Sequence, residues 1–224
     1  MERRRGFSLI EVIVALSLLG LLLGGILLVY TIGNRYLQQA ATAAGVQQQS
    51  MVALSLLERE LYNAPQISVN WQAGAFPTNY VWFLSAEGVS APSGGYRFQN
   101  GKLLFQKWVC YYLDTTPGYS PDFRLRRCEV ALNSPTEDLK LPPPADPLFS
   151  IPNLPAFLSI SSSTVVCNCV APSVGAFQVT QPPDSTNVYD VSLTTQDQTP
   201  VSMTSDKNKV VSLTLTSRVF PRNN

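Results

Sequence analysis

Glu11 is the only formal charge between Phe7 and Gly33, in the most apolar part of this 224-residue chain. An ionised carboxylate at membrane depth costs on the order of a few kcal/mol, so it indicates a functional site that needs a cationic partner. Near the start of a helix, the positive end of the helix dipole also favours a negative side chain. The residue type and its position therefore predict charge pairing in an apolar setting.

Four cysteines could form covalent bonds or bind a metal, namely Cys110, Cys128, Cys167 and Cys169. They allow three disulfide pairings. Cys110 and Cys128 fall on two neighbouring predicted strands, so a disulfide between them is geometrically reasonable. Cys167 and Cys169 would then bond to each other or to other partners. The alternative is a zinc site of four thiolates, although the spacing lacks the short gaps at both ends that such sites use. No cofactor is predicted.

The chain has no histidine, which is the commonest general base and metal ligand. We therefore expect a protein that is not an enzyme, with a signal-anchored periplasmic enzyme as an alternative. The net charge of +1 argues against a strongly basic nucleic-acid binder. One local mixture of basic and aromatic residues could still contact DNA, although the two faces of a strand give the same alternation. Its members are Lys102, Lys107, Trp108, Tyr111, Tyr112, Arg124, Arg126 and Arg127.

The first element expected to position these groups is a long N-terminal helix. The apolar residues 7–33 would extend about 40 Å as a helix, and the hydrocarbon core of a membrane is about 30 Å thick. Helix-forming residues continue to Asn63, and Pro65 ends the helix. Helical spacing predicts one apolar stripe and one wetter side over the last turns. The stripe consists of Met51, Leu54, Leu57 and Leu61, and the wetter side of Glu58, Arg59 and Glu60.

The second kind of element is the β-strand, which dominates after Pro65. Asn100-Gly101 is the strongest short signal for a β-hairpin. Residues 133–155 contain seven prolines and are expected to be an irregular excursion, because proline cannot occupy a central strand. The predicted strands are 66–71, 80–84, 96–99, 102–113, 123–132, 188–194 and 209–220.

The N-terminal residues resemble those of type IV pilin-like proteins, a family of major and minor pilins and of the pseudopilins of type II secretion. The resemblance rests on three arginines at positions 3–5, on the sequence Gly6-Phe7-Ser8-Leu9-Ile10-Glu11, and on the apolar run that follows. It implies the type IV pilin fold, of class α+β, in which a long N-terminal membrane-spanning helix packs on an antiparallel β-sheet domain.

Shorter segments resemble minor pilins of the PilW type and J-type minor pseudopilins. Residues 56–61, Leu-Leu-Glu-Arg-Glu-Leu, are similar to the end of their helix. Residues 109–113 and 125–128 are similar to their aromatic hairpin and its Leu-Arg-Arg return strand. The closing residues 211–218 fit the same pattern.

In this family a membrane-embedded prepilin peptidase cuts after the glycine, which implies cleavage between Gly6 and Phe7 and N-methylation of the Phe7 amine. The family glutamate, here Glu11, pairs with the N-terminal amine of a neighbouring subunit during assembly. Within one helix, Phe7 and Glu11 would also share a face, so the pair could form inside one chain or between two. The partners implied are other pilin or pseudopilin subunits, the peptidase, an inner-membrane assembly platform and membrane lipid.

The domains expected are a leader peptide (1–6), the transmembrane half of the helix (7–33), its periplasmic half (34–64) and a β-rich globular domain (65–224). Three arginines precede the anchor and only Arg35 follows it closely, which predicts a cytoplasmic leader. We expect a single-pass protein of the bacterial inner membrane with a periplasmic domain, which later joins a pilus or pseudopilus filament. The function expected is that of a minor pilin in filament initiation or at the tip, with DNA uptake or adhesion as further roles. A J-type minor pseudopilin of type II secretion is the alternative.

Overall fold

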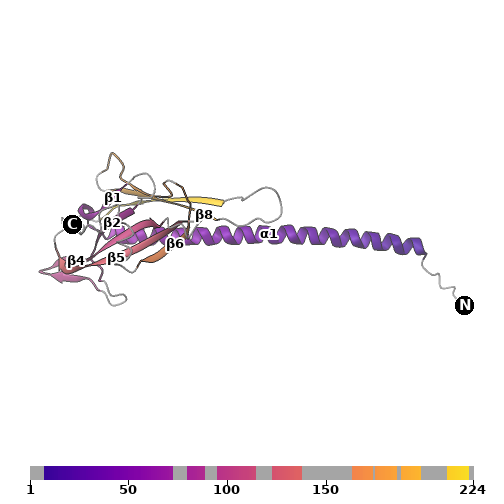
Figure 1. Ribbon diagram of the computed structural model, residues 1–224, viewed down its shortest axis with the longest axis horizontal. Coiled ribbons are helices and arrows are strands. Elements are labelled where there is room, and N and C mark those ends of the chain that lie inside the picture. Colours follow the sequence, from indigo (N-terminus) through magenta and orange to yellow (C-terminus); the bar gives the residue numbers. More distant parts are fainter. Residues whose placement is uncertain are drawn as a thin grey trace. The chain divides into compact units, whose positions relative to one another are not determined.

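The computed structural model describes residues 8–72, 80–88, 95–114, 123–137, 163–173, 175–185, 188–197 and 211–221. The chain divides into two compact units, Met1–Ala44 and Gly45–Asn224. One helix, α1 (Leu9–Tyr62), runs through both units and is the long N-terminal helix predicted from the sequence (Figure 1). The predicted leader 1–6 and Phe7 lie outside the described residues.

The last turns of α1 bury one face, because their buried residues recur every three or four positions. These residues are Val46, Ser50, Ala53, Leu54, Leu57, Glu60 and Leu61. Two details of the predicted pattern are wrong. Met51 is 49% exposed, and Glu60, expected on the wetter side, is only 8% exposed. Glu60 is buried because it has charged and hydroxyl partners on the sheet, which periodicity does not reveal.

Among the described residues, nine antiparallel strands follow a short 3-10 helix, η1 (Gln66–Ser68). Along the sheet the order is β1-β2-β4-β5-β6-β8-β7, with β3 paired to β4 and β9 paired to β8. The strands are β1 (Asn70–Gln72), β2 (Tyr80–Ser85), β3 (Arg97–Gln99), β4 (Lys102–Asp114), β5 (Phe123–Thr136), β6 (Thr164–Val170), β7 (Phe177–Thr180), β8 (Tyr189–Asp197) and β9 (Val211–Val219).

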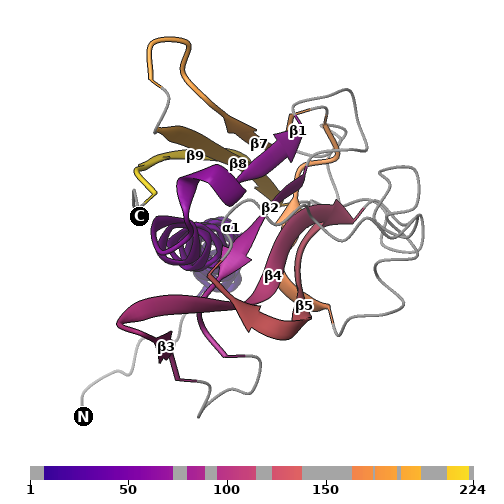
Figure 2. The same ribbon diagram turned by 90° about the vertical axis from the view of Figure 1, so that its left-hand side faces the viewer.

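The sheet curves around the last turns of α1, with β4 and β5 on one side and β8 and β9 on another (Figure 2). Contacts from both sides reach the helix: Arg127 of β5 binds Glu60, and Thr195 of β8 lies 2.7 Å from Ser50, hydroxyl to hydroxyl. The core between helix and sheet includes Leu57. This long helix packed on an antiparallel curled sheet confirms the predicted α+β fold.

Strand β4 is buried on both of its faces. Val109, Tyr111 and Leu113 belong to the core that contains the last turns of α1, whereas Cys110 and Tyr112 belong to a second cluster on the opposite face. A strand buried on both faces reads as a continuous apolar run rather than an alternating one. The sequence of β4 is mostly apolar without regular alternation. The strand could therefore be predicted, but which of its side chains face α1 could not.

The predicted hairpin at Asn100-Gly101 is confirmed. Gln99 pairs with Lys102, which leaves a two-residue loop between β3 and β4. Asn100 and Gly101 have φ values of 51° and 79°. Two consecutive positive φ values define the type I′ turn, whose twist matches that of the flanking strands.

Several predicted strand boundaries are wrong. Residues 66–71 divide into η1 and β1, and two strands, β6 and β7, were not predicted. Strand β5 also continues through Pro135 to Thr136, into a segment expected to be irregular. Its register against β4 jumps there, and its pairing with β6 covers only residues 123–127. Pro135 is tolerated because it lies at this bulge, where no ladder hydrogen bond is required of it.

Candidate assembly site

The first half of α1 exposes apolar side chains on every side. All residues from 8 to 38 are exposed, with fractions of 78% at Leu9 and 75% at Leu21. By length and composition, α1 is the helix among the described residues that could cross a membrane. The hydroxyls of Ser17 and Thr31 are satisfied within the helix, since they donate to the carbonyls of Ile13 and Leu28. A helix that is apolar all round is suited to lipid or to a bundle of similar helices.

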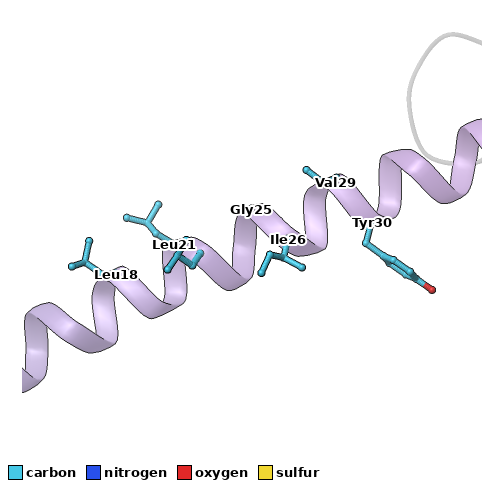
Figure 3. Close-up of a pocket in the computed structure, with 7 residues that line it drawn as sticks. Leu18, Leu21, Gly25, Ile26, Val29 and Tyr30 are labelled. Carbon is cyan, nitrogen blue, oxygen red and sulfur yellow. The ribbon is translucent and has the colours of Figure 1, made fainter.

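One face of this segment carries a shallow apolar hollow (Figure 3). Gly25 lies among the residues that line the hollow, and beyond its own helix backbone and its two chain neighbours no atom lies within 4 Å of where its Cβ would be. Glycine in a membrane helix permits the close approach of another helix. The lining residues are Leu18, Leu21, Leu22, Gly25, Ile26, Val29 and Tyr30.

Glu11 caps its own helix at the start of this apolar segment. The Ser8 amide donates to Glu11 Oε2 at 3.0 Å, and the Glu11 amide donates to Ser8 Oγ at 3.3 Å. These two reciprocal bonds form a capping box, which satisfies amides that the first turn leaves without helical partners. The Ser-x-x-Glu spacing is a sequence signature of the capping box, but this cap was not predicted from the sequence.

The capping box fixes Glu11 at the start of the helix, where Ser8 is the N-cap and α1 begins at Leu9. Gly6 and Phe7 lie outside the described residues, and pairing with the Phe7 amine stays a prediction. Glu11 uses Oε2 in its cap, and one carboxylate can accept several hydrogen bonds. An ammonium group from a neighbouring chain could therefore bind Glu11 without breaking the cap.

A chain of charged groups joins the end of α1 to the sheet. Arg127 makes a forked contact with Glu60, with Nε 3.0 Å from Oε2 and Nη2 2.9 Å from Oε1. Tyr111 donates its hydroxyl to Glu60 Oε2 at 2.7 Å. Arg127 Nη2 also lies 3.1 Å from Glu129 Oε2, which accepts from Lys107 Nζ at 2.7 Å. Two carboxylates and two cations therefore neutralise each other at the contact between helix and sheet.

Burial and partner charges set the protonation states in this network. Burial raises the pKa of Tyr111, and the Glu60 carboxylate raises it further, so Tyr111 is a neutral hydrogen-bond donor. Burial alone would lower the pKa of Arg127, but the hydrogen bond and charge of Glu60 outweigh it and raise that pKa. The groups are therefore fixed as an ion-pair scaffold. The pKa values of Tyr111 and Arg127 are both moved away from neutrality, where an acid–base catalyst would be held.

Glu129 makes the stability of this network depend on pH. Burial raises the pKa of Glu129, but the hydrogen bond from Lys107 and the charges of Lys107 and Arg127 lower it by more. A carboxyl with a lowered pKa stabilises the fold above its unfolded value, about 4.3, and loses this contribution as pH falls through the folded value. We expect the urea midpoint of the wild type to fall more steeply than that of Glu129→Gln below about pH 4.3. Parallel pH curves, recorded in added salt to screen surface pairs, would contradict this role.

Four of the basic residues that were candidates for DNA contact are engaged by carboxylates. Arg126 Nε lies 2.7 Å from Asp114 Oδ2, and Lys102 lies 3.1 Å from Glu137. Lys107 is only 4% exposed. Together with Arg127, these residues alternate between the two faces of the β4–β5 ladder. These four cations are therefore neutralised by acidic neighbours, and contact with DNA stays a prediction.

The four cysteines occupy two places in the sheet. Cys110 and Cys128 are direct register partners on β4 and β5. Cys167 and Cys169 lie on β6, with Sγ atoms 3.6 Å apart. All four are free thiols in this structure. Among the described residues, no group of three or more histidine, cysteine or acidic side chains could hold a metal ion, so the geometry does not support the alternative of a four-cysteine zinc site.

The chain matches the family model described as the prokaryotic N-terminal methylation motif over residues 1–27. A search of the curated proteins and a search of the solved structures each found no significant match. The motif and the observed fold support a type IV pilin-like protein with the type IV pilin fold. The motif implies processing by a prepilin peptidase, assembly with other pilin subunits and anchoring in the inner membrane. It favours a structural protein over an enzyme.

Proposed function

We propose that this protein is a minor pilin, a structural subunit that acts in the initiation or at the tip of a type IV pilus. The observation that carries the proposal is the methylation motif at residues 1–27 leading directly into the exposed apolar half of α1. Such a surface is stable only in lipid or against other apolar helices. The globular part of the subunit would then face the periplasm before assembly and the filament surface afterwards.

The segments that resemble minor pilins and J-type pseudopilins meet in the fold, which supports the narrower assignment. Glu60 comes from the Leu-Leu-Glu-Arg-Glu-Leu segment, Tyr111 from the aromatic hairpin and Arg127 from its return strand. Their side chains bind one another directly. The resemblance thus falls on residues that fix the helix end to the sheet, a scaffold that minor pilins and J-type pseudopilins would share.

Deletion of the gene separates the proposed function from its alternative. A minor pilin is expected to leave cells with few or no surface pili, and the protein should occur in sheared filaments at much lower amounts than the major pilin. A J-type pseudopilin predicts the opposite pattern, with normal pili and loss of a protein secreted across the outer membrane. Electron microscopy and analysis of the culture medium distinguish these results.

Processing of the leader gives a direct prediction for Gly6 and Phe7. Mass spectrometry of the membrane-extracted protein is expected to find N-methyl-Phe7 as the first residue. Replacement of Gly6 by valine should block cleavage almost completely, because peptidases of this family favour glycine before the cut, and the precursor should remain in the inner membrane. An intact Met1 terminus on the wild-type protein, in cells with an active peptidase, would refute the processing.

A further inference from the structure

Cys167 and Cys169 are brought together by an irregularity in β6. Alternate residues of a regular strand are about 6.5–7 Å apart, at or beyond the upper end of the usual Cα separation in a disulfide. The register of β6 shifts twice here, because Phe123 pairs with Val170, Leu125 with Cys167 and Arg126 with Val165. Each shift leaves one extra residue on β6, which is the signature of a bulge. The two sulfurs consequently lie 3.6 Å apart.

The two cysteine pairs differ in their access to solvent. Cys110 and Cys128 are 4% and 0% exposed and lie in the cluster on the sheet face opposite to α1. Cys167 is also buried, at 1% exposure, but its neighbour Cys169 is partly exposed. A dissolved thiol or disulfide could therefore reach a sulfur of the second pair without unfolding the sheet, whereas both sulfurs of the first pair are covered.

The two pairs also differ in electrostatics. The side-chain hydrogen bond with Cys169 lowers the pKa of Cys167 and, with a backbone hydrogen bond, outweighs the effect of burial. In the other pair, the hydrogen bond with Cys128 and complete burial both raise the pKa of Cys110. The thiolate is the reactive form of cysteine, so these shifts favour thiol chemistry at Cys167 and disfavour it at Cys110.

We propose that Cys167 and Cys169 form a thiol–disulfide exchange site open to low-molecular-weight thiols and disulfides, whereas Cys110 and Cys128 are closed to them. In the oxidising direction, the partly exposed Cys169 Sγ loses its proton to solvent, attacks one sulfur of the incoming disulfide and releases the first half of that disulfide as a thiolate. The Cys167 thiolate then attacks Cys169 Sγ and releases the second half. Two electrons and two protons pass from the cysteine pair to the incoming disulfide, which leaves as two thiols.

Reduction follows the reverse path and has a preferred direction of attack. An external thiolate reaches the partly exposed Cys169 Sγ, and Cys167 leaves. A thiol of lower pKa is the better leaving group, so the environment of Cys167 favours this step.

The exchange site also contacts α1, because Gln49 Oε1 lies 3.6 Å from Cys169 Sγ and 3.5 Å from the Asn168 amide. Closing the disulfide would remove the Cys169 thiol hydrogen that faces Gln49.

Redox equilibration of the processed full-length protein in detergent tests this site. The protein is incubated in mixtures of reduced and oxidised glutathione, quenched with acid, labelled with a maleimide and mapped by peptide mass spectrometry. Cys167 and Cys169 are expected to change oxidation state together under native conditions. Cys110 and Cys128 should change only when denaturant is added. Exchange of all four cysteines at one rate, or no native exchange at Cys167 and Cys169, would overturn the proposal.

Two single variants assign the roles within the pair. Cys167→Ser leaves Cys169 with no resolving thiol, so a mixed disulfide with glutathione should accumulate at Cys169. Cys169→Ser leaves only the buried Cys167 and should give at least tenfold less of this adduct. Circular dichroism melting curves like that of the wild type show that both variants are folded. Equal adduct on two folded variants, or none on folded Cys167→Ser, would contradict the assignment. The experiment uses no filament, so its result is independent of the proposed pilus function.

Discussion

Glu11→Gln is expected to reduce incorporation into filaments roughly tenfold or more while leaving cleavage after Gly6 intact. A hydrogen bond to a charged group contributes about 1.5–3 kcal/mol, and each 1.4 kcal/mol corresponds to about a factor of ten. Glutamine at the third helical position still serves in a capping box, so the substitution removes the charge and retains the cap. The measurement is the ratio of processed protein in sheared filaments to processed protein in the membrane.

Ser8→Ala is the matched control for this experiment. It removes the Oγ that accepts from the Glu11 amide at 3.3 Å but leaves the carboxylate and its charge in place. Loss of an N-cap costs about 1 kcal/mol of helix stability, so a small effect on assembly is expected. If Ser8→Ala and Glu11→Gln lower the ratio equally, assembly depends on a well-ordered first turn of the helix and not on the charge of Glu11. If neither changes the ratio, Glu11 is not an assembly residue and the globular part recruits the subunit.

Arg127→Met is expected to destabilise the globular part by about 3–5 kcal/mol, because it leaves the Glu60 carboxylate buried without its cation. Unfolding free energies of natural domains are about 5–15 kcal/mol, so this loss would leave the fold marginal. The side chains of Arg127 and Glu60 are 15% and 7% exposed, and water cannot easily replace either partner. Urea unfolding of the processed protein, followed by circular dichroism, measures the change.

The pair Arg218–Asp190 supplies a control with the same chemistry at the surface. Arg218 Nε lies 2.7 Å from Asp190 Oδ1 in a second forked contact, but the two side chains are 60% and 26% exposed. Exposed pairs contribute little because water screens them, so Arg218→Met should leave the urea midpoint unchanged. Equal losses for Arg127→Met and Arg218→Met would show that burial does not decide the strength of these contacts.

A combined variant separates the removal of one charge from the removal of the whole pair. Replacing Glu60 by leucine, Arg127 by methionine and Tyr111 by phenylalanine leaves apolar groups of similar size. Such replacements of buried ion pairs are often neutral or stabilising, and Glu129 retains Lys107 at 2.7 Å. The triple variant is therefore expected to be more stable than Arg127→Met alone. A still greater loss of stability would mean that the polar network is required for this packing.

The sequence by itself determined the features that depend on neighbouring residues. An apolar run long enough to span a membrane favours a helix, because in lipid a single segment can satisfy all its backbone groups internally only as a helix. Asn100-Gly101 gives a type I′ turn because these residues tolerate positive φ. The Gly-Phe-Ser-Leu-Ile-Glu sequence lies within the match to the prokaryotic N-terminal methylation motif, and such a motif can be recognised because it depends on a short stretch of chain.

Strands β6 and β7 and the path of β5 were decided by pairing with other strands. The sequence of β6 has β-branched residues but also a bulge at each register shift, which removes the alternation that identifies a strand. Pro135 argued against a strand, yet it lies where β5 has bulged away from its ladder with β4. Local composition could not supply this information, because the partner strand determines whether an amide needs a hydrogen bond.

Only the tertiary structure decided the roles of Glu60, Arg127 and the cysteines. Glu60 lies 67 positions before Arg127, and a charged residue near a helix end reads as solvated until its partner on the sheet is known. Cys110 and Cys128 were placed on adjacent strands from the sequence, and their direct register is what the structure added. Burial then separates them from Cys167 and Cys169, because solvent access depends on how the whole chain packs around each sulfur.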